Sequence, residues 1–478
     1  MSNKKLEQCL DLLLELPIQT FSTNSEWVAK NHVFVCREGA VHDSHGYVTH
    51  AIENGAIAII ATKPVQATVP VIVTDSYYQS VSLIKAYYRF PHHQLKHIGI
   101  TGTNGKTTIA YGLQQILTRQ CKSSYIGTLG VKYADKHEPL DNTTPDAVTL
   151  LNLFDDMVNA GVLLNVMELS SHALAQDRAG FVPLEVGVIS NIGRDHLDYH
   201  RTIDGYVQAK LQLIDRIKPG GTLVVNLDDP HAGVAIDRAK LRNNVMTFSI
   251  GNHEADVVAD EVQATQFGNQ FTMYYQGEHA VVDSQMPFRF NVENQLAMAS
   301  VLLSQGWRLN AVAAALSGLT PINGRSQFIS LDNRATALVD YAHNYDGLLA
   351  LFQGIDVRQW GKVITVIGVT GDRIREAARI GQLCAEHSDV VIFTSDNPLG
   401  EMQEDIFRAL TSRVGDTPYY EVSDRLEAIQ LAKQLSRSQD LLLLCGKGHE
   451  LHQHVTANKI GRQSYIGDRA AVSMEGKQ

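Results

Sequence analysis

Short apolar runs separated by polar or glycine-containing stretches make up most of the chain. In the first part, apolar residues at 33–35, 56–61 and 71–73 predict the strands of a small α/β unit. Before these strands, apolar side chains recur at helical spacing at Leu6, Cys9, Leu10, Leu13 and Leu14. We therefore expect a first amphipathic helix followed by a small α/β domain.

A second unit begins after residues 90–93, where Phe-Pro-His-His interrupts the pattern. The run 97–100 predicts a short buried strand, and a glycine-rich turn leads from it into a helix expected over residues 109–118. Later apolar runs, which alternate with helical stretches as in a mainly parallel sheet, lie at 164–167, 186–189 and 222–226. Apolar and polar residues then alternate from about 257 to 282, which predicts an added β-rich section.

The strand pattern starts again after Gly324 and Arg325. Helical stretches separate the expected strands, which lie at 336–339, 363–367, 390–393 and 441–444. This alternation is typical of a doubly wound, Rossmann-like domain. We therefore expect an α/β protein of three domains. They are a small α/β domain at 1–91, a central parallel-sheet domain with a phosphate loop at 92–325, and a C-terminal doubly wound domain at 326–478.

Composition and charge narrow the classes of function. The chain is 44% hydrophobic and 19% charged, as in ordinary globular proteins, and its formal charge of −10 argues against a nucleic-acid partner. The N-terminus lacks the apolar stretch of a signal peptide, and no apolar run reaches the ~20 residues that cross a membrane. Five scattered cysteines form no C-x-x-C pair, which fits a reducing compartment. We expect a cytoplasmic protein with no membrane partner, in solution a monomer.

The segment 101–108, Thr-Gly-Thr-Asn-Gly-Lys-Thr-Thr, follows the predicted strand directly. It departs from the usual phosphate-loop spacing because Ile100 stands where the first glycine is expected. The remaining chemistry suits ATP: glycine backbone amides approach phosphates, Lys106 neutralises their charge and Thr107 can ligate Mg²⁺. The expected ATP-binding loop residues are Gly102, Thr103, Asn104, Gly105, Lys106, Thr107 and Thr108. A plain glycine-rich turn with a surface lysine is the structural alternative.

Ten short motifs resemble those of the Mur ligase family, in particular its UDP-N-acetylmuramoyl-tripeptide synthetase (MurE) branch. They follow in family order across nearly the whole chain. They are TGTNGKTT at 101–108, NTTPDA at 142–147, MELSSHAL at 167–174, NIGRDHLDYH at 191–200, YVQAK at 206–210, FNVEN at 290–294, GRSQ at 324–327, VDYAH at 339–343, SDNP at 395–398 and GKGHE at 446–450. The resemblance implies ATP-dependent amide-bond formation through an acyl phosphate, with an N-terminal UDP-binding domain.

The resemblance also implies a Mg²⁺ site formed by Thr107, Glu168, His196 and Lys210. In the family the lysine that matches Lys210 is carbamylated, which turns a cation into an anionic oxygen ligand. Structural alternatives exist for each residue: a strand-end charge for Glu168, a loop histidine bonded to Asp195 or Asp198 for His196, and a solvated helix face for Lys210. Lys106, Lys210, His196 and Arg325 are the expected catalytic residues.

Residues for the nucleotide follow from the later motifs. Asn291 and Asn294 lie three apart, so a helix beginning there carries both on one face, and by resemblance they contribute to the adenine site. Arg325 is expected at the γ-phosphate. Asp340 is expected at the ribose or the magnesium shell, at the end of the first C-terminal strand with His343 nearby. An interface salt bridge and strand-end caps are the alternatives.

For the acceptor, the resemblance implies contacts to a UDP-muramoyl dipeptide. The residues concerned are Ser25, Asn142, Thr143, Thr144, Ser170 and Arg178. Arg178 can bind a carboxylate bidentately, although a turn at 142–145 and a surface arginine would explain the same residues. In the N-terminal domain the family's Asp-Ser-Arg triplet is replaced by Asn24-Ser25-Glu26, so only the serine is retained.

The C-terminal domain is expected to present a free amino acid as the second partner. The residues implied are Arg373, Asp396, Asn397, Glu401, Gly446 and Glu450. Diaminopimelate-adding members usually have an arginine after Asp-Asn-Pro, whereas this chain has Leu399, which cannot bind a second carboxylate. We therefore expect L-lysine to be favoured, with meso-diaminopimelate, another amino acid or another acceptor as alternatives.

Other departures from the family pattern indicate a divergent member. They are Phe288-Arg289 before the FNVEN motif, Gln327 in place of a glutamate and Asn344-Tyr345 in place of threonine-proline. A folylpolyglutamate synthetase-like ligase and a non-catalytic precursor-binding protein are the other hypotheses. The NTTPDA motif argues against the first. The retained Lys106, Glu168 and Lys210 argue against the second.

Overall fold

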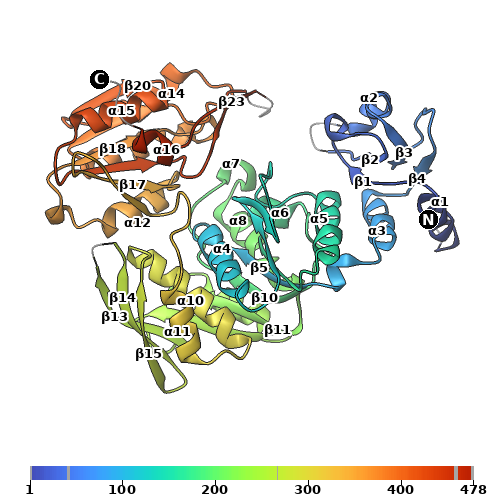
Figure 1. The fold of residues 1–478 in the computed structure, drawn as a ribbon, viewed down its shortest axis with the longest axis horizontal. Helices are drawn as coiled ribbons and strands as arrows, with labels where there is room; N and C mark the ends of the chain where they lie inside the picture. Colours follow the sequence, from blue (N-terminus) through green and yellow to red (C-terminus); the bar gives the residue numbers. More distant parts are fainter. Residues whose placement is uncertain (1–2, 40–42, 266, 457–460, 475–478) are drawn as a thin grey trace.

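The computed structural model describes residues 3–39, 43–265, 267–456 and 461–474. Figure 1 shows a central α/β region with a small N-terminal sheet on one side and a C-terminal α/β region on the other. The strands form sheets of four, eleven and six strands and one two-stranded hairpin. The three-domain α/β architecture predicted from the sequence is confirmed. In the described part of the chain, no helix is long and apolar enough to cross a membrane.

The N-terminal sheet is parallel, in the order β1-β2-β3-β4. Its strands are β1 (Thr20–Ser22), β2 (His32–Val35), β3 (Ala56–Ala61) and β4 (Val71–Val73), and its helices are α1 (Asn3–Leu14), α2 (Val48–Glu53) and α3 (Tyr77–Tyr87). The predicted amphipathic helix is present as α1, whose Leu13 is fully buried. A short 3-10 helix, Pro91–His93, stands where the pattern broke and leads into the next sheet.

The central sheet has the order β15-β14-β13-β12-β11-β10-β5-β9-β6-β7-β8. Its strands are β5 (Lys96–Thr101), β6 (Ser123–Gly127), β7 (Gly130–Tyr133), β8 (Lys136–Glu138), β9 (Leu164–Glu168), β10 (Leu184–Ile189), β11 (Ile217–Asn226), β12 (Asn244–Ile250), β13 (Val257–Ala264), β14 (Asn269–Tyr275) and β15 (Glu278–Ser284). Pairing is parallel from β6 to β13 and antiparallel at both edges, so the predicted β-rich section is the edge β13–β15. The interior strand β5 therefore delivers the expected phosphate loop to the middle of the sheet.

The helices of the central region are α4 (Lys106–Leu117), α5 (Ala147–Asn159), α6 (Ser171–Ala175), α7 (Leu197–His200), α8 (Ile203–Leu211), α9 (Ala232–Ala239), α10 (Arg289–Ser304) and α11 (Leu309–Ser317). The predicted start of α4 at Ile109 is wrong, because the helix begins at Lys106. Gly105, with φ of 86°, turns the chain directly from the loop into the helix, a conformation that L side chains rarely adopt. Lys106 and Thr107 therefore belong to the first helical turn.

The C-terminal sheet has the order β16-β17-β21-β18-β19-β20. Its strands are β16 (Gln327–Ser330), β17 (Thr336–Asp340), β18 (Val363–Ile367), β19 (Val390–Thr394), β20 (Tyr419–Val422) and β21 (Leu441–Cys445). Its helices are α12 (Tyr345–Gly354), α13 (Ile374–Glu386), α14 (Gln403–Thr411), α15 (Arg425–Leu435) and α16 (Asp468–Ser473), and β22 (His452–His454) and β23 (Arg462–Ser464) form the hairpin. The antiparallel strand β16 precedes β17, so the prediction that Asp340 ends the first strand of this domain is wrong. Only partly buried, β16 lacks the apolar run that marks the interior strands β17, β21, β18 and β19.

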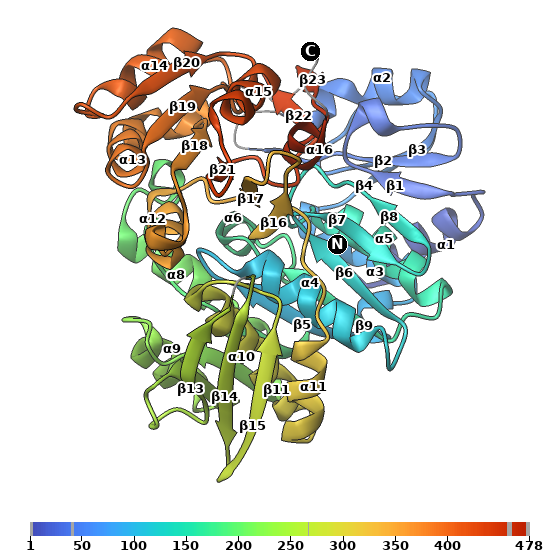
Figure 2. The same ribbon diagram turned by 60° about the vertical axis from the view of Figure 1, so that its left-hand side comes forward.

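The chain between α11 and β16 joins the two larger regions (Figure 2). Polar contacts between their loops also join them. Arg373 donates to Asp195 at 2.6 Å, and Asn344 donates to the other oxygen of the same carboxylate at 3.2 Å. On the opposite side, Asn152 of α5 donates to the carbonyl of Phe21 in β1 at 2.7 Å. Both outer regions thus contact the central one.

Candidate active site

The phosphate loop lies between β5 and α4 and is held by the segment that follows β10. The backbone N–H of Asn104 donates to Asn191 Oδ1 at 2.9 Å, and Ser190 Oγ donates to the Asn104 carbonyl at 2.7 Å. The Lys106 ammonium donates to the carbonyls of Gly102 and Thr103 at 2.8 and 3.0 Å. Burial lowers the pKa of Lys106, and an anion beside it would favour the charged form. The loop is preorganised for phosphate.

Glu168 lies at the carboxyl end of β9, fully buried beside this loop. Its carboxylate accepts hydrogen bonds from the Thr107 hydroxyl at 3.0 Å, the Tyr125 hydroxyl at 2.5 Å and the Thr128 hydroxyl at 3.1 Å. The Thr128 N–H donates to it as well, at 3.0 Å. Such bonds offset the cost of burying a carboxylate. Glu168 is therefore fixed at the phosphate loop and is not a strand-end charge exposed to water.

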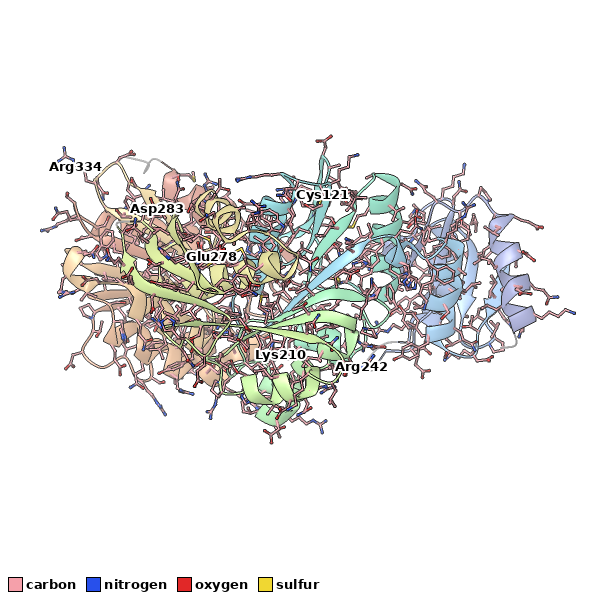
Figure 3. All side chains as sticks on the ribbon, turned by 90° about the horizontal axis from the view of Figure 1, so that it is seen from below. Cys121, Lys210, Arg242, Glu278, Asp283 and Arg334 are labelled. Atoms are coloured by element: carbon pink, nitrogen blue, oxygen red, sulfur yellow. The ribbon has the colours of Figure 1, made fainter. Side chains whose placement is uncertain are left out.

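Lys210 is buried beside the phosphate loop, and the interpretation as a solvated helix lysine is wrong. Its side chain, labelled in Figure 3, comes from α8 in the central region and donates to the Gly102 carbonyl at 2.7 Å. The residue is 1% exposed. Burial, followed by the nearby Lys106 charge, lowers the pKa of Lys210 well below its ordinary value. A neutral amine is the form that reacts with carbon dioxide, so the environment suits carbamylation.

His196 caps α7 with a positive φ of 51°. Burial lowers the pKa of His196 to about 3, so the imidazole is neutral and can offer a nitrogen to a metal. Its Nε2 lies 3.8 Å from Asp195 Oδ2, too far for a hydrogen bond. Its ring lies 4.8 Å from that of His172, measured between centroids.

The oxygen atoms around Thr107 and Glu168 suit Mg²⁺, which prefers oxygen ligands. Within the described ranges, no group of three or more His, Cys, Asp or Glu side chains forms a metal cage. A Mg²⁺ site that is completed by the Thr107 hydroxyl and by oxygen atoms of the substrates would need no such cage. Lys210 fits such a site only as a carbamate, because its ammonium form would repel the cation.

The residues expected for the nucleotide surround the same loop. Asn291 and Asn294 lie on one face of α10, where Asn294 Nδ2 donates to Asn291 Oδ1 at 3.0 Å, as predicted from their spacing. Arg325 donates to the Thr107 hydroxyl at 3.1 Å. Asp340, at the end of β17, accepts from the Ser326 N–H at 2.6 Å. His343 lies beyond it, and burial lowers its pKa.

Most residues expected for the acceptor lie next to Glu168. The Thr143 and Thr128 hydroxyls are 3.1 Å apart, and Thr144 donates to the Glu168 carbonyl at 2.8 Å. Ser170 accepts from the Ala173 N–H at 3.1 Å as the cap of α6. Arg178 donates to the Thr144 carbonyl at 2.9 Å and, through Nη2, to Gln176 at 2.9 Å.

Burial, followed by the charge of Arg37 from the N-terminal domain, lowers the pKa of Arg178. An anion bound near Arg178 would offset the repulsion between the two arginine charges. Asn142 is exposed at the edge of the acceptor group. Ser25 belongs to the N-terminal sheet region, where its hydroxyl lies 3.1 Å from His50 Nδ1.

Three of the residues expected for the amino acid meet around a buried lysine that the sequence did not single out. Lys447 is fully buried and lies 3.1 Å from Asp396 Oδ1, 2.9 Å from Glu450 Oε2 and 2.9 Å from Asn397 Oδ1. Although burial opposes it, the Lys447 ammonium lowers the pKa of Glu450. One cation faces two carboxylates, so this cluster keeps one net negative charge for an ammonium group.

The other residues of this group are arranged differently. Gly446 follows β21 with φ of 102°, close to Asp396. Arg373 is paired with Asp195 across the two regions, away from the Lys447 cluster. Glu401 is exposed, and among the residues that the structure describes no hydrogen bond or ion pair joins its carboxylate to the cluster. The Leu399 N–H donates to the His454 carbonyl at 3.3 Å, which fastens its loop to the β22–β23 hairpin.

Sequence reasoning missed several residues that hold the site together. Tyr125 and Thr128 fix Glu168 from about forty positions earlier in the chain, a separation that carries no sequence signal. Asn191 and Lys447 stood inside quoted motifs, NIGRDHLDYH and GKGHE, and a search for polar residues at strand ends would have found both.

Two family matches cover most of the chain. The Mur ligase middle domain matches residues 100–302, and the Mur ligase, glutamate ligase domain matches residues 324–448. UDP-N-acetylmuramoyl-L-alanyl-D-glutamate–2,6-diaminopimelate ligase of Geobacillus thermodenitrificans is 35% identical over 95% of both chains. A protein of the same name from Clostridium acetobutylicum, numbered 1, is 33% identical over 93% of this chain and 92% of its own.

Solved structures agree with these matches. A 2,6-diaminopimelate ligase of the same name has a TM-score of 0.64 at 28% identity, with 95% of each chain covered. MurF ligase from Thermotoga maritima in complex with ADP has a TM-score of 0.70 at 18% identity, covering 94% of this chain and 96% of its own. At that identity the second likeness concerns the fold alone.

Proposed function

The chain belongs to the Mur ligase family, its relatives being ligases of the MurE type, and we propose that it joins a diamino acid to UDP-N-acetylmuramoyl-L-alanyl-D-glutamate at the expense of ATP. One observation carries this proposal. Thr107 of the phosphate loop, Glu168 and Arg325 are hydrogen-bonded together directly beside the acceptor threonines, Thr143 and Thr144. Phosphate donor and carboxylate acceptor would therefore meet at Glu168.

The proposed reaction has two steps. A carboxylate oxygen of the dipeptide attacks the γ-phosphorus of ATP, the bond between that phosphorus and the bridging oxygen breaks, and ADP leaves as an acyl phosphate forms. The amine nitrogen then attacks the acyl carbon, loses a proton, and phosphate leaves with the carboxylate oxygen. Lys106 and Arg325 would neutralise charge on the transferred phosphoryl group, and the backbone amides of 102–105 would hold the nucleotide. Asn291, Asn294 and Asp340 would orient adenine and ribose.

We propose that Mg²⁺ is held by Thr107, Glu168, His196 and carbamylated Lys210, and that it neutralises charge between phosphate and acceptor when bound. The chain's contribution is to fix those ligands. The bonds from Tyr125 and Thr128 hold the Glu168 carboxylate in one orientation, and burial keeps the His196 imidazole neutral. Ser25, Asn142, Ser170 and Arg178 would bind the UDP-muramoyl dipeptide.

Two features bear on which amino acid the protein uses, and they favour different substrates. The names of the relatives favour meso-diaminopimelate, which was the alternative to L-lysine in the sequence analysis. Leu399 still favours L-lysine, since its side chain cannot pair with a second carboxylate. Asp396, Asn397, Gly446 and Glu450 would bind the ammonium end in either case. We place meso-diaminopimelate first and L-lysine second.

We also propose the domain limits 1–91, 92–325 and 326–478, with the first domain mainly binding the UDP-sugar, the second ATP and the third the amino acid. Five free cysteines and the need for ATP support a cytoplasmic site of action. We propose that the enzyme works as a monomer, because every expected site residue lies in one chain.

Phosphate release with the UDP-muramoyl dipeptide and ATP tests the proposal. Separate reactions contain meso-diaminopimelate, L-lysine or L-ornithine. We expect release that depends on all three substrates, with the highest kcat/KM for meso-diaminopimelate. A preference for L-lysine would support the assignment from Leu399, and release with none of the amino acids would refute the proposal.

A further inference from the structure

One aromatic side chain connects the arginine at the phosphate loop with the glutamate at the amino-acid loop. Tyr341 follows Asp340 at the end of β17. The guanidinium carbon of Arg325 lies 4.3 Å from the centre of the Tyr341 ring, and the Tyr341 hydroxyl donates to Glu450 Oε1 at 3.0 Å. We propose that Tyr341 is a positioning residue for the reaction, which fixes Arg325 with its ring and Glu450 with its hydroxyl.

The hydroxyl determines how the Glu450 carboxylate is oriented. Burial and the Glu450 charge raise the pKa of Tyr341 well above its ordinary value, so the phenol stays protonated and acts as a donor. The other oxygen of Glu450 accepts from Lys447 at 2.9 Å and from Asn397 at 3.2 Å. Bonds to both oxygens fix the plane of the carboxylate. Without the hydroxyl, Oε1 would lose its bond from Tyr341 while Oε2 keeps its bonds, and the carboxylate could rotate away from an incoming ammonium.

The ring has a separate role at Arg325. In the part of the chain that the structure describes, the buried Arg325 Nε has no hydrogen-bond partner, and the Nη2 bond to Thr107 leaves the guanidinium plane unfixed. Contact with the face of Tyr341 supplies the missing restraint, because a guanidinium is attracted to an aromatic face. A phenylalanine would retain this contact, whereas a leucine would not.

The backbone around Tyr341 supports this connection. A Cβ on Gly324, the residue before Arg325, would lie 2.3 Å from the backbone nitrogen of His449. A Cβ on Gly448 would lie 2.7 Å from the Gly324 carbonyl oxygen and 3.0 Å from Tyr341 Cβ. Two glycines thus allow the arginine segment and the amino-acid loop to pack backbone against backbone. Tyr341 lies at their junction.

This inference rests on the proposed function, and it is tested by the kinetics of Tyr341→Phe and Tyr341→Leu with meso-diaminopimelate and with L-lysine. Loss of a hydrogen bond to a charged group predicts about a tenfold rise in the amino-acid KM for Tyr341→Phe, with the ATP KM and kcat within about twofold of wild type. Tyr341→Leu should in addition lower kcat by about tenfold, since the guanidinium loses its aromatic contact. Tyr345→Phe is a matched control, because Tyr345 also lies 4.3 Å from an arginine, Arg379.

The outcomes separate this inference from the proposed function. No phosphate release by the wild-type protein with either amino acid would overturn the proposed function and the role of Tyr341 with it. A wild-type amino-acid KM for Tyr341→Phe in an otherwise active enzyme would overturn only the role of Tyr341. A uniform rise in every KM with a lowered Tm would also overturn it, because that pattern reports a general loss of structure.

Discussion

The ion pair between Asp195 and Arg373 should contribute strongly to the use of the amino acid. It joins the central and C-terminal regions through a 2.6 Å contact between side chains that are 4% and 10% exposed. Burial alone would raise the pKa of Asp195 and lower that of Arg373, but the pairing outweighs it: the pKa of Asp195 is lowered and that of Arg373 raised. Both groups are therefore charged. Each depends on the other to offset the cost of burial.

The Asp195→Asn variant removes one charge and keeps one acceptor oxygen. Removing one partner of a buried pair costs about 3–5 kcal/mol, and the retained oxygen places Asn at the lower end. A loss of about 3 kcal/mol corresponds to about a hundredfold fall in kcat/KM for the amino acid, provided that the domain contact is needed for turnover. The Asp198→Asn variant, an exposed carboxylate three positions later, should stay within about twofold of wild type.

A double-mutant cycle with Arg373→Met tests the coupling directly. In the Arg373→Met background, Asp195→Asn should change kcat/KM by less than about threefold, because its partner is already absent. Initial rates of phosphate release at saturating ATP and dipeptide provide the measurement. Equal losses in both backgrounds would show that Asp195 acts without Arg373.

Three further predictions concern the phosphate loop, the metal site and the buried histidine of β5, His97. Lys106→Ala should abolish ADP release in a coupled assay, because the loop loses its phosphate-binding ammonium; activity within about tenfold of wild type would contradict this. Lys210→Ala should be nearly inactive and recover partly when short carboxylates such as formate or acetate are added. Full turnover without them would show that no carbamate on Lys210 is needed. Burial lowers the pKa of His97 in the folded protein from its ordinary 6.5 to about 4. Above pH 6.5 the imidazole is neutral in both the folded and the unfolded protein. As pH falls from 6.5 towards 4 the unfolded chain binds a proton that the folded protein does not, so the stability of the folded protein falls. At pH 5 this effect of His97 alone should lower the free energy of unfolding, measured in urea, by about 2 kcal/mol. The His97→Gln variant should therefore lose less stability than wild type between pH 7.5 and pH 5. An identical loss in both proteins would contradict this.

Features that depend on neighbours in the sequence were predicted well. The run before the phosphate loop identified β5, because a buried interior strand of a parallel sheet has apolar residues on both faces. Glu168 was found at the end of β9 for the same reason. The spacing of Asn291 and Asn294 placed both on one face of α10, and the alternation of residues 257–282 identified the β13–β15 edge.

Features that depend on contacts across the chain were not predicted. Nothing near Glu168 in the sequence points to Tyr125 or Thr128, which meet it only because β6 pairs with β9. Arg373 was expected at the amino acid, yet its partner in the structure is Asp195, 178 positions earlier. The β16 strand was not predicted, because it is partly buried and pairs antiparallel at the edge of the C-terminal sheet. Pairing and domain contact, which decide these positions, leave no periodic pattern.

Transfer of a carboxylate oxygen to phosphate would show directly that the acceptor is activated as an acyl phosphate. The dipeptide nucleotide is labelled with oxygen-18 in its acceptor carboxylate and incubated with the protein, ATP and meso-diaminopimelate or L-lysine. The released phosphate is then analysed by mass spectrometry. If the carboxylate is activated as an acyl phosphate beside Glu168, each phosphate released should carry one labelled oxygen. Amide formation with release of unlabelled phosphate would contradict activation through an acyl phosphate.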